Sequence, residues 1–199
     1  MNSTKKGDLF EERVYNVLLQ AMMNEELFVS PTHSFIFKKK SYFSKDREKD
    51  IIFDLAIESY RPGAVSPNLI ILIECKDYDS PVSIDNLEEF YAKKEQVARA
   101  NCKCLFFSTS SLQAAAFTYA SNLNIGVVRL LSDESMEWLI ERTNIHLQTT
   151  DQSAQTINVI NGITNEYFVS TRKNTFGFAE QTPFYSIEEL LKVLLLSID

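Results

Sequence analysis

The spacing of apolar residues predicts an amphipathic helix near the start of the chain. Six apolar residues fall at helical spacing and would form one stripe on a helix: Phe10, Val14, Val17, Leu18, Ala21 and Met22. Asp8 stands just before this stripe and is of a residue type that caps helices. We therefore expect a first helix that is capped by Asp8 and buries one face.

Three strand-like runs follow, at residues 33–43, 50–58 and 68–76, with turn-rich segments between them. The third run contains Leu69-Ile70-Ile71-Leu72-Ile73, which is apolar on both faces. Such a strand belongs in the middle of a sheet that is covered on both sides. The short turns between these runs favour antiparallel pairing.

From residue 83 onward, helical and strand patterns alternate. Helical spacing covers residues 83–100 and 111–123, and buried strands are predicted at 104–107 and 125–130. Strand-helix-strand units favour parallel pairing, because the helix carries the chain back across the sheet. The predicted fold class is therefore α/β, an α/β/α sandwich around a central mixed sheet.

The last third of the chain has another character. It contains a short helical pattern at 136–142, a polar stretch at 148–156, and hairpin-like runs around Asn161-Gly162 and Arg172-Lys173-Asn174. A final helix is expected to start at Ser186, where Ser186-x-x-Glu189 fits a capping box. We expect residues 1–132 to form the core domain and 133–199 to form a small α+β extension of unknown role. This extension is too short for a large core of its own, so it should pack on the first domain or on another subunit.

Composition narrows the class of protein. A chain of 199 residues with 45% hydrophobic residues can bury one good core. Its apolar runs are far shorter than the roughly 20 residues of a membrane span, and its polar start lacks the apolar stretch of a signal peptide. We therefore expect a soluble, cytoplasmic protein without a membrane partner. Cys75, Cys102 and Cys104 are expected to be reduced thiols, and no zinc site is readable.

The formal net charge of −7 argues against a protein that coats nucleic acid by charge alone. Basic residues nevertheless gather in two clusters, one made of Lys38, Lys39, Lys40, Lys45, Arg47 and Lys49, the other of Lys93, Lys94, Arg99 and Lys103. Each cluster is either a local nucleic-acid contact or a solvated face that is balanced by nearby acids.

The chain contains one E-x-K sequence, Glu74-Cys75-Lys76, at the end of the apolar third strand. Residues two apart in a strand share a face, so Glu74 and Lys76 should point the same way while Cys75 points into the opposite layer. Charges at the end of an apolar strand are costly without a partner or a metal. A purely structural role is therefore less attractive for this pair, although an E-x-K sequence by itself would favour an ordinary salt bridge.

The preceding strand supplies a second carboxylate. Ile51, Phe53, Leu55 and Ile57 are expected to form one apolar face, which leaves Asp54 on the other face. Neighbouring strands would then bring Asp54 and Glu74 together as a hard-oxygen site suited to magnesium, with Lys76 beside it. The alternative is an ordinary structural salt bridge. We rank it below the functional interpretation because Asp54 is expected on the same face as Glu74 and because the order of helices and strands fits such a site.

With these residues the chain resembles a known family, the Mrr-type restriction endonucleases of the PD-(D/E)xK superfamily. The resemblance spans about residues 7–131. It is carried by the segments Gly7-Asp8-Leu9-Phe10-Glu11, Asp50-x-x-x-Asp54, Glu74-Cys75-Lys76, Phe107-Ser108-Thr109-Ser110 and Ala116-x-x-x-Ala120 before Ile125.

The resemblance implies roles for individual residues. Asp54 and Glu74 would hold the metal with help from the backbone carbonyl of Cys75, and Lys76 would position or activate the attacking water. Glu11 would be an additional acid on the metal side, although Asp8-x-x-Glu11 also fits a capping box. The implied cofactor is Mg²⁺, with Mn²⁺ as the alternative.

The function expected from the sequence is hydrolysis of DNA phosphodiester bonds by a magnesium-dependent endonuclease in a restriction or defence role. One alternative is a catalytically silent nuclease fold that serves as a binding or assembly subunit; another is a structure-specific or RNA nuclease, since the fold does not choose the substrate. Besides DNA, a homodimer or other defence or repair subunits are expected partners. The apolar segment 190–196 is the candidate dimer contact, or else it caps the core.

Overall fold

The computed structural model describes residues 3–24, 31–97, 101–131, 159–168, 175–179, 182–187, 190–191 and 194. Within this part of the chain, seven strands form one sheet in the order of the sequence. The strands are β1 (Ser34–Ser44), β2 (Lys49–Ser59), β3 (Leu69–Lys76), β4 (Cys102–Ser108), β5 (Ile125–Leu130), β6 (Thr175–Ala179) and β7 (Thr182–Phe184). The helices are α1 (Ser3–Met23), α2 (Ile84–Val97) and α3 (Ala114–Asn122).

The pairing of the strands makes the sheet mixed, as predicted. β1, β2 and β3 pair antiparallel, whereas β3, β4 and β5 pair parallel through the crossover helices α2 and α3. β6 and β7 then add to β5 as an antiparallel hairpin. The α/β fold class and the order of its elements are thus confirmed for the described residues.

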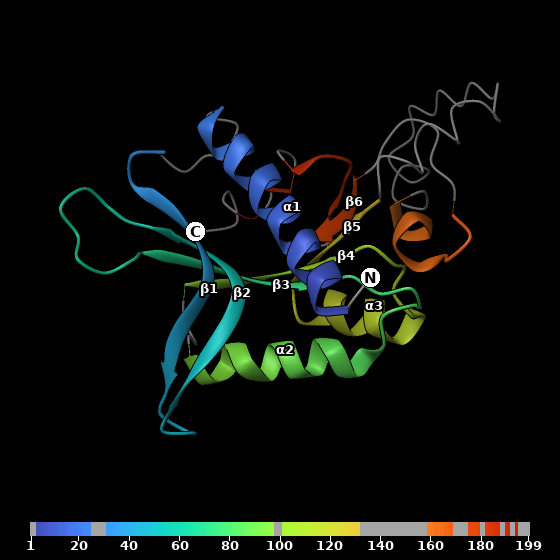
Figure 1. The fold of residues 1–199 in the computed structure, drawn as a ribbon, viewed down its shortest axis with the longest axis horizontal. Coiled ribbons are helices and arrows are strands. Elements are labelled where there is room, and N and C mark those ends of the chain that lie inside the picture. The colour runs from blue at the N-terminus through green and yellow to red at the C-terminus, as the bar shows by residue number, and fades with distance from the viewer. Residues whose placement is uncertain are drawn as a thin grey trace.

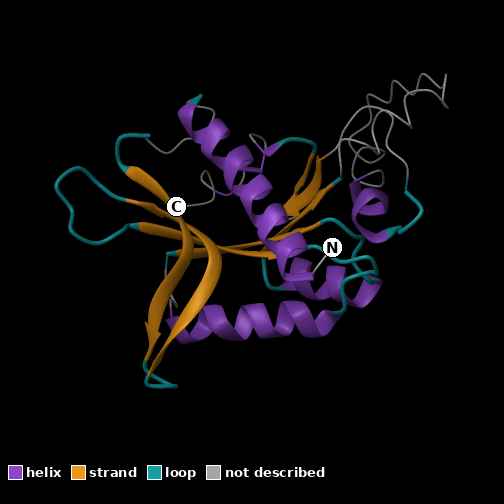
Figure 2. Cartoon of the chain, in the orientation of Figure 1, coloured by secondary structure: helices purple, strands orange, loops and turns teal. Residues whose placement is uncertain are grey.

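Helices cover the two faces of the sheet (Figures 1 and 2). One core lies under α1 and includes Val14 and Leu18 of that helix together with alternate residues of β2, β3, β4 and β5. The other lies under α2 and α3 and includes Leu87, Phe90 and Ala116. The apolar part of β3, residues 69–73, contributes to both cores, which explains its continuous hydrophobic run.

The β2 strand changes face in its middle. Ile51 and Phe53 pack in the core under α2, whereas Leu55 and Ile57 pack in the core under α1. The prediction that these four residues form one apolar face is therefore wrong. Residues two apart share a face only while a strand keeps its regular pleat. The pleat is broken between Phe53 and Leu55, so Asp54 lies where the side chains of β2 change from one face of the sheet to the other.

The neighbouring strand marks the same point. Lys39 of β1 has a left-handed backbone with φ of 50°. The residue pairs of β1 and β2 on either side of Lys39 keep one register, which sets Lys39 opposite Asp54. Figure 1 shows both strands curling strongly along their length. The hairpin therefore bends where these two charged residues face each other.

The first helix begins earlier than predicted. It extends from Ser3, so Asp8 lies inside the helix and cannot cap it. An ion pair helps to hold the added turn, because Lys6 Nζ lies 2.5 Å from Asp79 Oδ1 and 3.6 Å from Asp77 Oδ1. The capping-box interpretation of Asp8 and Glu11 is consequently wrong.

The described C-terminal residues join the same sheet and the same core. Residues 159–164 are helical, so the hairpin predicted around Asn161-Gly162 is wrong there; the hairpin is instead formed by β6 and β7. Ile187, Leu190, Leu191 and Leu194 are helical and buried against the α1 core. These leucines thus cap the core of one chain. The patterns at 136–142, 148–156 and 172–174 lie outside the described residues.

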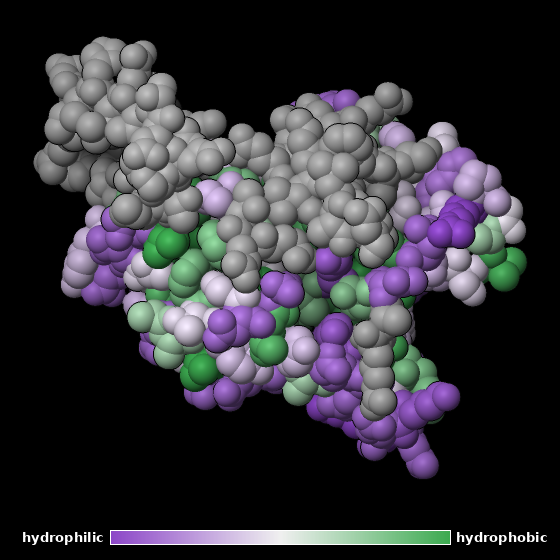
Figure 3. Space-filling model, turned by 180° about the vertical axis from the view of Figure 1, so that it is seen from behind, coloured by the Kyte–Doolittle hydropathy of each residue, from purple (hydrophilic) through white to green (hydrophobic). Residues whose placement is uncertain are grey.

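Two surface properties bear on function. The tip of the β1–β2 hairpin, at the lower right in Figure 3, carries hydrophilic side chains. Its exposed residues 45–50 read Lys-Asp-Arg-Glu-Lys-Asp, so their charges balance. No helix in the described residues has both the length and the apolar character to cross a membrane.

Candidate active site

The structure brings Asp54 and Glu74 to neighbouring positions on β2 and β3. Leu55 pairs with Ile73, and the two acids occupy the next position on each strand, where the ladder ends. Asp54 Oδ2 accepts a hydrogen bond from the backbone N–H of Cys75 at 2.9 Å. This bond fixes one oxygen of Asp54 against the edge of β3 and leaves its other oxygen available for a cation.

Glu74 and Lys76 form a sheltered ion pair. Glu74 is only 5% exposed, and its Oε1 accepts a hydrogen bond from Lys76 Nζ at 2.8 Å. Lys93 of α2 approaches the same oxygen at 3.5 Å, which places Glu74 on the α2 side of the sheet. Burial lowers the pKa of Lys76, but the charge and hydrogen bond of Glu74 outweigh it and the pKa is raised. Lys76 is therefore a cation at neutral pH, suited to stabilising negative charge.

Cys75 lies on the opposite face, as the alternation predicts. Its side chain is buried in the α1 core. Burial, followed by the nearby charge of Asp54, raises the pKa of the Cys75 thiol well above its ordinary value. The thiol is thus a packing group and not a nucleophile. Only the backbone of Cys75 faces the site.

Glu11 of α1 reaches the site through a lysine. Lys39 Nζ lies 2.6 Å from Glu11 Oε1 and 2.9 Å from Asp54 Oδ1, so it bridges the two carboxylates. Burial raises the pKa of Glu11, and the charge of Asp54 adds to this while Lys39 opposes it. Burial lowers the pKa of Lys39, but its hydrogen bonds to Glu11 and Asp54 raise it on balance. Glu11 thus belongs to the same group of charges as Asp54.

Sequence reasoning placed Lys39 in a basic cluster and missed its place in the site. A signal was nevertheless present in the hairpin. A turn at residues 45–48 sets Ser44 opposite Lys49, and counting back five residues along one strand and forward five along the other sets Lys39 opposite Asp54. The period of the strand did not reveal this contact, because it depends on the register of two strands.

The donor atoms present fit magnesium better than they fit a softer metal. Among the described residues, no three His, Cys, Asp or Glu side chains gather into a metal-binding group. Magnesium, however, is commonly held by one or two carboxylates together with waters and substrate phosphates. Asp54 and Glu74, with Glu11 nearby, supply hard oxygens of this kind.

Charges in the site balance one another. Glu11, Asp54 and Glu74 face the three lysines Lys39, Lys76 and Lys93. Other members of the two basic clusters are paired in the same way, with Lys38 bound to Glu12, Lys40 to Glu58 and Lys94 to Glu95. Acids thus balance the described lysines of β1 and α2, which favours the second of the two interpretations of these clusters.

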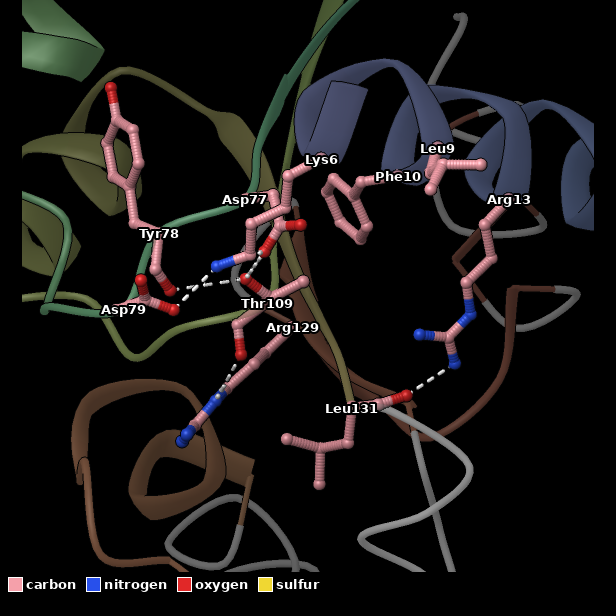
Figure 4. A pocket seen from close by; sticks show the side chains of 10 residues that line it. All are labelled: Lys6, Leu9, Phe10, Arg13, Asp77, Tyr78, Asp79, Thr109, Arg129 and Leu131. Carbon is pink, nitrogen blue, oxygen red and sulfur yellow. Dashed lines mark hydrogen bonds and ion pairs between the residues drawn. The ribbon is translucent and has the colours of Figure 1, made fainter. Parts of the chain in front are cut away.

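A pocket opens where the strand of Lys76 ends (Figure 4). Its volume is about 500 Å³, and it is bounded by the start of α1 and by the carboxyl ends of β3, β4 and β5. Thr109 in its wall donates a backbone hydrogen bond to the carbonyl of Lys76 at 3.2 Å. Arg129 on another wall is 6% exposed and donates to backbone carbonyls of Thr109, Gly162 and Asn165. The pocket therefore lies at the carboxyl edge of the parallel strands, where ligands of open α/β sheets commonly bind, but the residues that line it do not include Asp54, Glu74 or Lys76.

Comparison with known proteins gives one family match. A sequence model described as a restriction endonuclease, Mrr_cat, matches residues 16–139, which is more than half of the chain. The matched range contains Lys39, Asp54, Glu74 and Lys76 but not Glu11. None of the curated proteins matches the chain.

One solved structure is similar, the crystal structure of a protein of unknown function named AF1548. It shares 18% sequence identity with this chain at a TM-score of 0.38, and the match covers 56% of each chain. The chain thus spans just over half the length of that protein.

Proposed function

The chain belongs to the Mrr-type restriction endonuclease family, and from this premise we propose that it is a magnesium-dependent endonuclease that hydrolyses DNA phosphodiester bonds in restriction or defence. The observation that carries the proposal is the juxtaposition of Asp54 and Glu74 on adjacent strands, with Lys76 hydrogen-bonded to Glu74. Two carboxylates that could hold a divalent cation, beside a lysine that could stabilise negative charge, are suited to phosphodiester hydrolysis.

Each residue has a task that its surroundings support. Asp54 and Glu74, assisted by the backbone carbonyl of Cys75, would hold the cation, and Glu11 would be an additional metal ligand facing Asp54 across the place where Lys39 lies in the metal-free protein. Bound magnesium supplies a Lewis acid for the scissile phosphate and a lowered pKa for an attacking water. Lys76 stays protonated and stabilises the charge that develops on the phosphate oxygens.

A second candidate is a nuclease-fold subunit that binds or assembles without turnover. The observation in its favour is that Glu11, Asp54 and Glu74 are each paired with a lysine and the site is neutral overall. The net charge of −7 also favours a protein partner over an extended nucleic-acid contact. It ranks second because Asp54, Glu74 and Lys76 are all present.

A panel of nucleic acids tests the proposal. The full chain is incubated with supercoiled and linear duplex DNA, single-stranded DNA, a four-way junction and RNA, each with magnesium, with calcium and without a divalent ion. We expect cleavage of duplex DNA with magnesium, and binding with little cleavage with calcium, because calcium is larger and holds its ligands in looser geometry.

Other results of the panel would support one of the alternative functions or contradict the metal site. Cleavage confined to RNA or to the junction would move the chain to the structure-specific or RNA nuclease alternative. Binding without cleavage under every condition would support the silent subunit. Equal cleavage rates in magnesium and calcium would contradict the metal site described above.

A further inference from the structure

We propose that Lys39 is an exchangeable counter-cation of the metal site: its ammonium group holds the place between Glu11 and Asp54 that a divalent cation takes when it binds. The proposal rests on the proposed function, since it concerns the same carboxylates. It adds a residue that neither the motif nor the family resemblance assigns to the site.

The first observation is the contact geometry. Lys39 Nζ lies within 2.9 Å of one oxygen on each of the two carboxylates, so the three charges share one small space. An ammonium and a magnesium ion cannot both occupy the space between these oxygens. Binding of the metal there therefore requires Lys39 to leave.

The second observation is the difference in exposure between the lysine and its partners. The side chains of Glu11 and Asp54 are 17% and 18% exposed, whereas that of Lys39 is 51% exposed. The ammonium can swing into solvent at little cost, because a long lysine side chain keeps its charge hydrated there. Asp54 has a second partner that does not involve Lys39, because the backbone N–H of Cys75 donates a hydrogen bond to its other carboxylate oxygen.

The third observation is the backbone of Lys39. Its φ of 50° lies in the left-handed region, which is unfavourable for a residue with a side chain. A strand keeps such a residue only where the surroundings demand it. Here the demand coincides with the bend that sets Lys39 opposite Asp54, which ties the position of the lysine to the shape of the site.

Electrostatics gives the sign of the effect. Without a cation, Glu11 and Asp54 repel each other, and Lys39 relieves this repulsion in the metal-free protein. Magnesium must displace that favourable contact, so Lys39 weakens metal binding while it stabilises the metal-free fold. A merely structural lysine would act in the opposite direction, because its loss would disorder the site and weaken metal binding.

The test is a calorimetric titration of the full chain with magnesium, in the absence of nucleic acid, on the parent and on Lys39→Met. Lys38→Met is the matched control, because Lys38 directly precedes Lys39 in β1 and pairs with Glu12, outside the site. We expect Lys39→Met to bind magnesium several-fold more tightly, on the order of five-fold for one partly exposed ion pair, and to melt at a lower temperature without metal. Lys38→Met should keep the parental affinity.

The outcomes separate this proposal from the proposed function. Parental or weaker magnesium affinity in Lys39→Met, with a parent that binds magnesium and cleaves DNA, overturns the role of Lys39 and leaves the nuclease intact. A parent that does not bind magnesium contradicts both. Lys39→Gln, which keeps a donor but no charge, is titrated alongside, so that poor folding of one variant does not decide the result.

Discussion

Single buried charges in this protein are stabilised by specific partners, and Glu58 away from the site illustrates the rule. Its carboxylate is 4% exposed and accepts hydrogen bonds from Tyr42 at 2.7 Å and from Tyr60 at 2.6 Å, with Lys40 at 3.3 Å. Burial alone would raise the pKa of Glu58, but the bonds from Tyr60 and Tyr42 and the contact with Lys40 lower it overall. The hydrogen bond between Tyr60 and Glu58 in turn raises the pKa of Tyr60 to about 12.

The sign of this shift predicts how stability depends on pH. Because the folded state lowers the pKa of Glu58, its stabilising contribution is present above the ordinary value of 4.5 and is lost as the pH falls through the lower folded value. Glu58→Gln should therefore be less stable than the parent at pH 7, by about 1–3 kcal/mol for hydrogen bonds to a charged group. The difference should shrink toward pH 3. Urea denaturation of both proteins across this range is the measurement, and a difference that stays constant would refute the assignment.

Residue identity and strand period were enough to predict the motif but not its surroundings. Glu74 and Lys76 were predicted to share a face because they stand two residues apart on β3, whereas Asp54 was predicted from a regular alternation that β2 does not keep. Lys39 was missed because its contact with Asp54 depends on the register between β1 and β2 and on a bend of the hairpin. Neither can be predicted from the alternation of apolar and polar residues along one strand. The roles of these residues in catalysis stay predictions until the variants are measured.

At the scale of elements, local pattern predicted most helices and strands, since a core buried on both faces imposes clear periods on α1, β3, α2, β4, α3 and β5. The failures have physical causes. The Asn161-Gly162 pair is typical of a turn, yet residues 159–164 form a helix that buries Val159 and Ile163. Tertiary packing there outweighs the local turn preference.

Arg129 attaches this short helix to the sheet. Its Nη1 donates to the carbonyls of Gly162 and Asn165, each at 2.8 Å, and its Nε donates to Thr109 at 3.4 Å. Burial lowers the pKa of the Arg129 guanidinium. We expect Arg129→Met to lower the free energy of unfolding by about 3 kcal/mol, because buried carbonyls lose their donors.

Arg61→Met is the control for this substitution, because Arg61 is exposed in the loop after β2. Its free energy of unfolding should stay close to that of the parent. Urea denaturation of the two variants compares them directly. If Arg129→Met were as stable as Arg61→Met, the three hydrogen bonds would not be holding the helix to the sheet.

At the scale of the whole molecule, the described C-terminal residues complete the sheet and one of its cores. β6 pairs with β5, and Leu190, Leu191 and Leu194 are buried under α1. These leucines are therefore already covered within one chain. A homodimer stays a prediction, which rests on the need for two sites to cut both strands of a duplex. The division of the chain into a core domain, residues 1–132, and an extension, residues 133–199, likewise stays a proposal.

The central claim, that the charges around Glu74 form a metal-dependent nuclease site, is tested most directly by one pair of variants. Lys76→Met removes the cation that is hydrogen-bonded to Glu74, whereas Lys38→Met removes a neighbouring lysine that is bound to Glu12. The measurement is the rate of DNA cleavage in magnesium by parent and variants, with circular dichroism to show that each is folded. We predict magnesium-dependent cleavage by the parent, a loss of roughly 100-fold or more in Lys76→Met, and a parental rate in Lys38→Met. Cleavage by folded Lys76→Met at the parental rate would contradict the account.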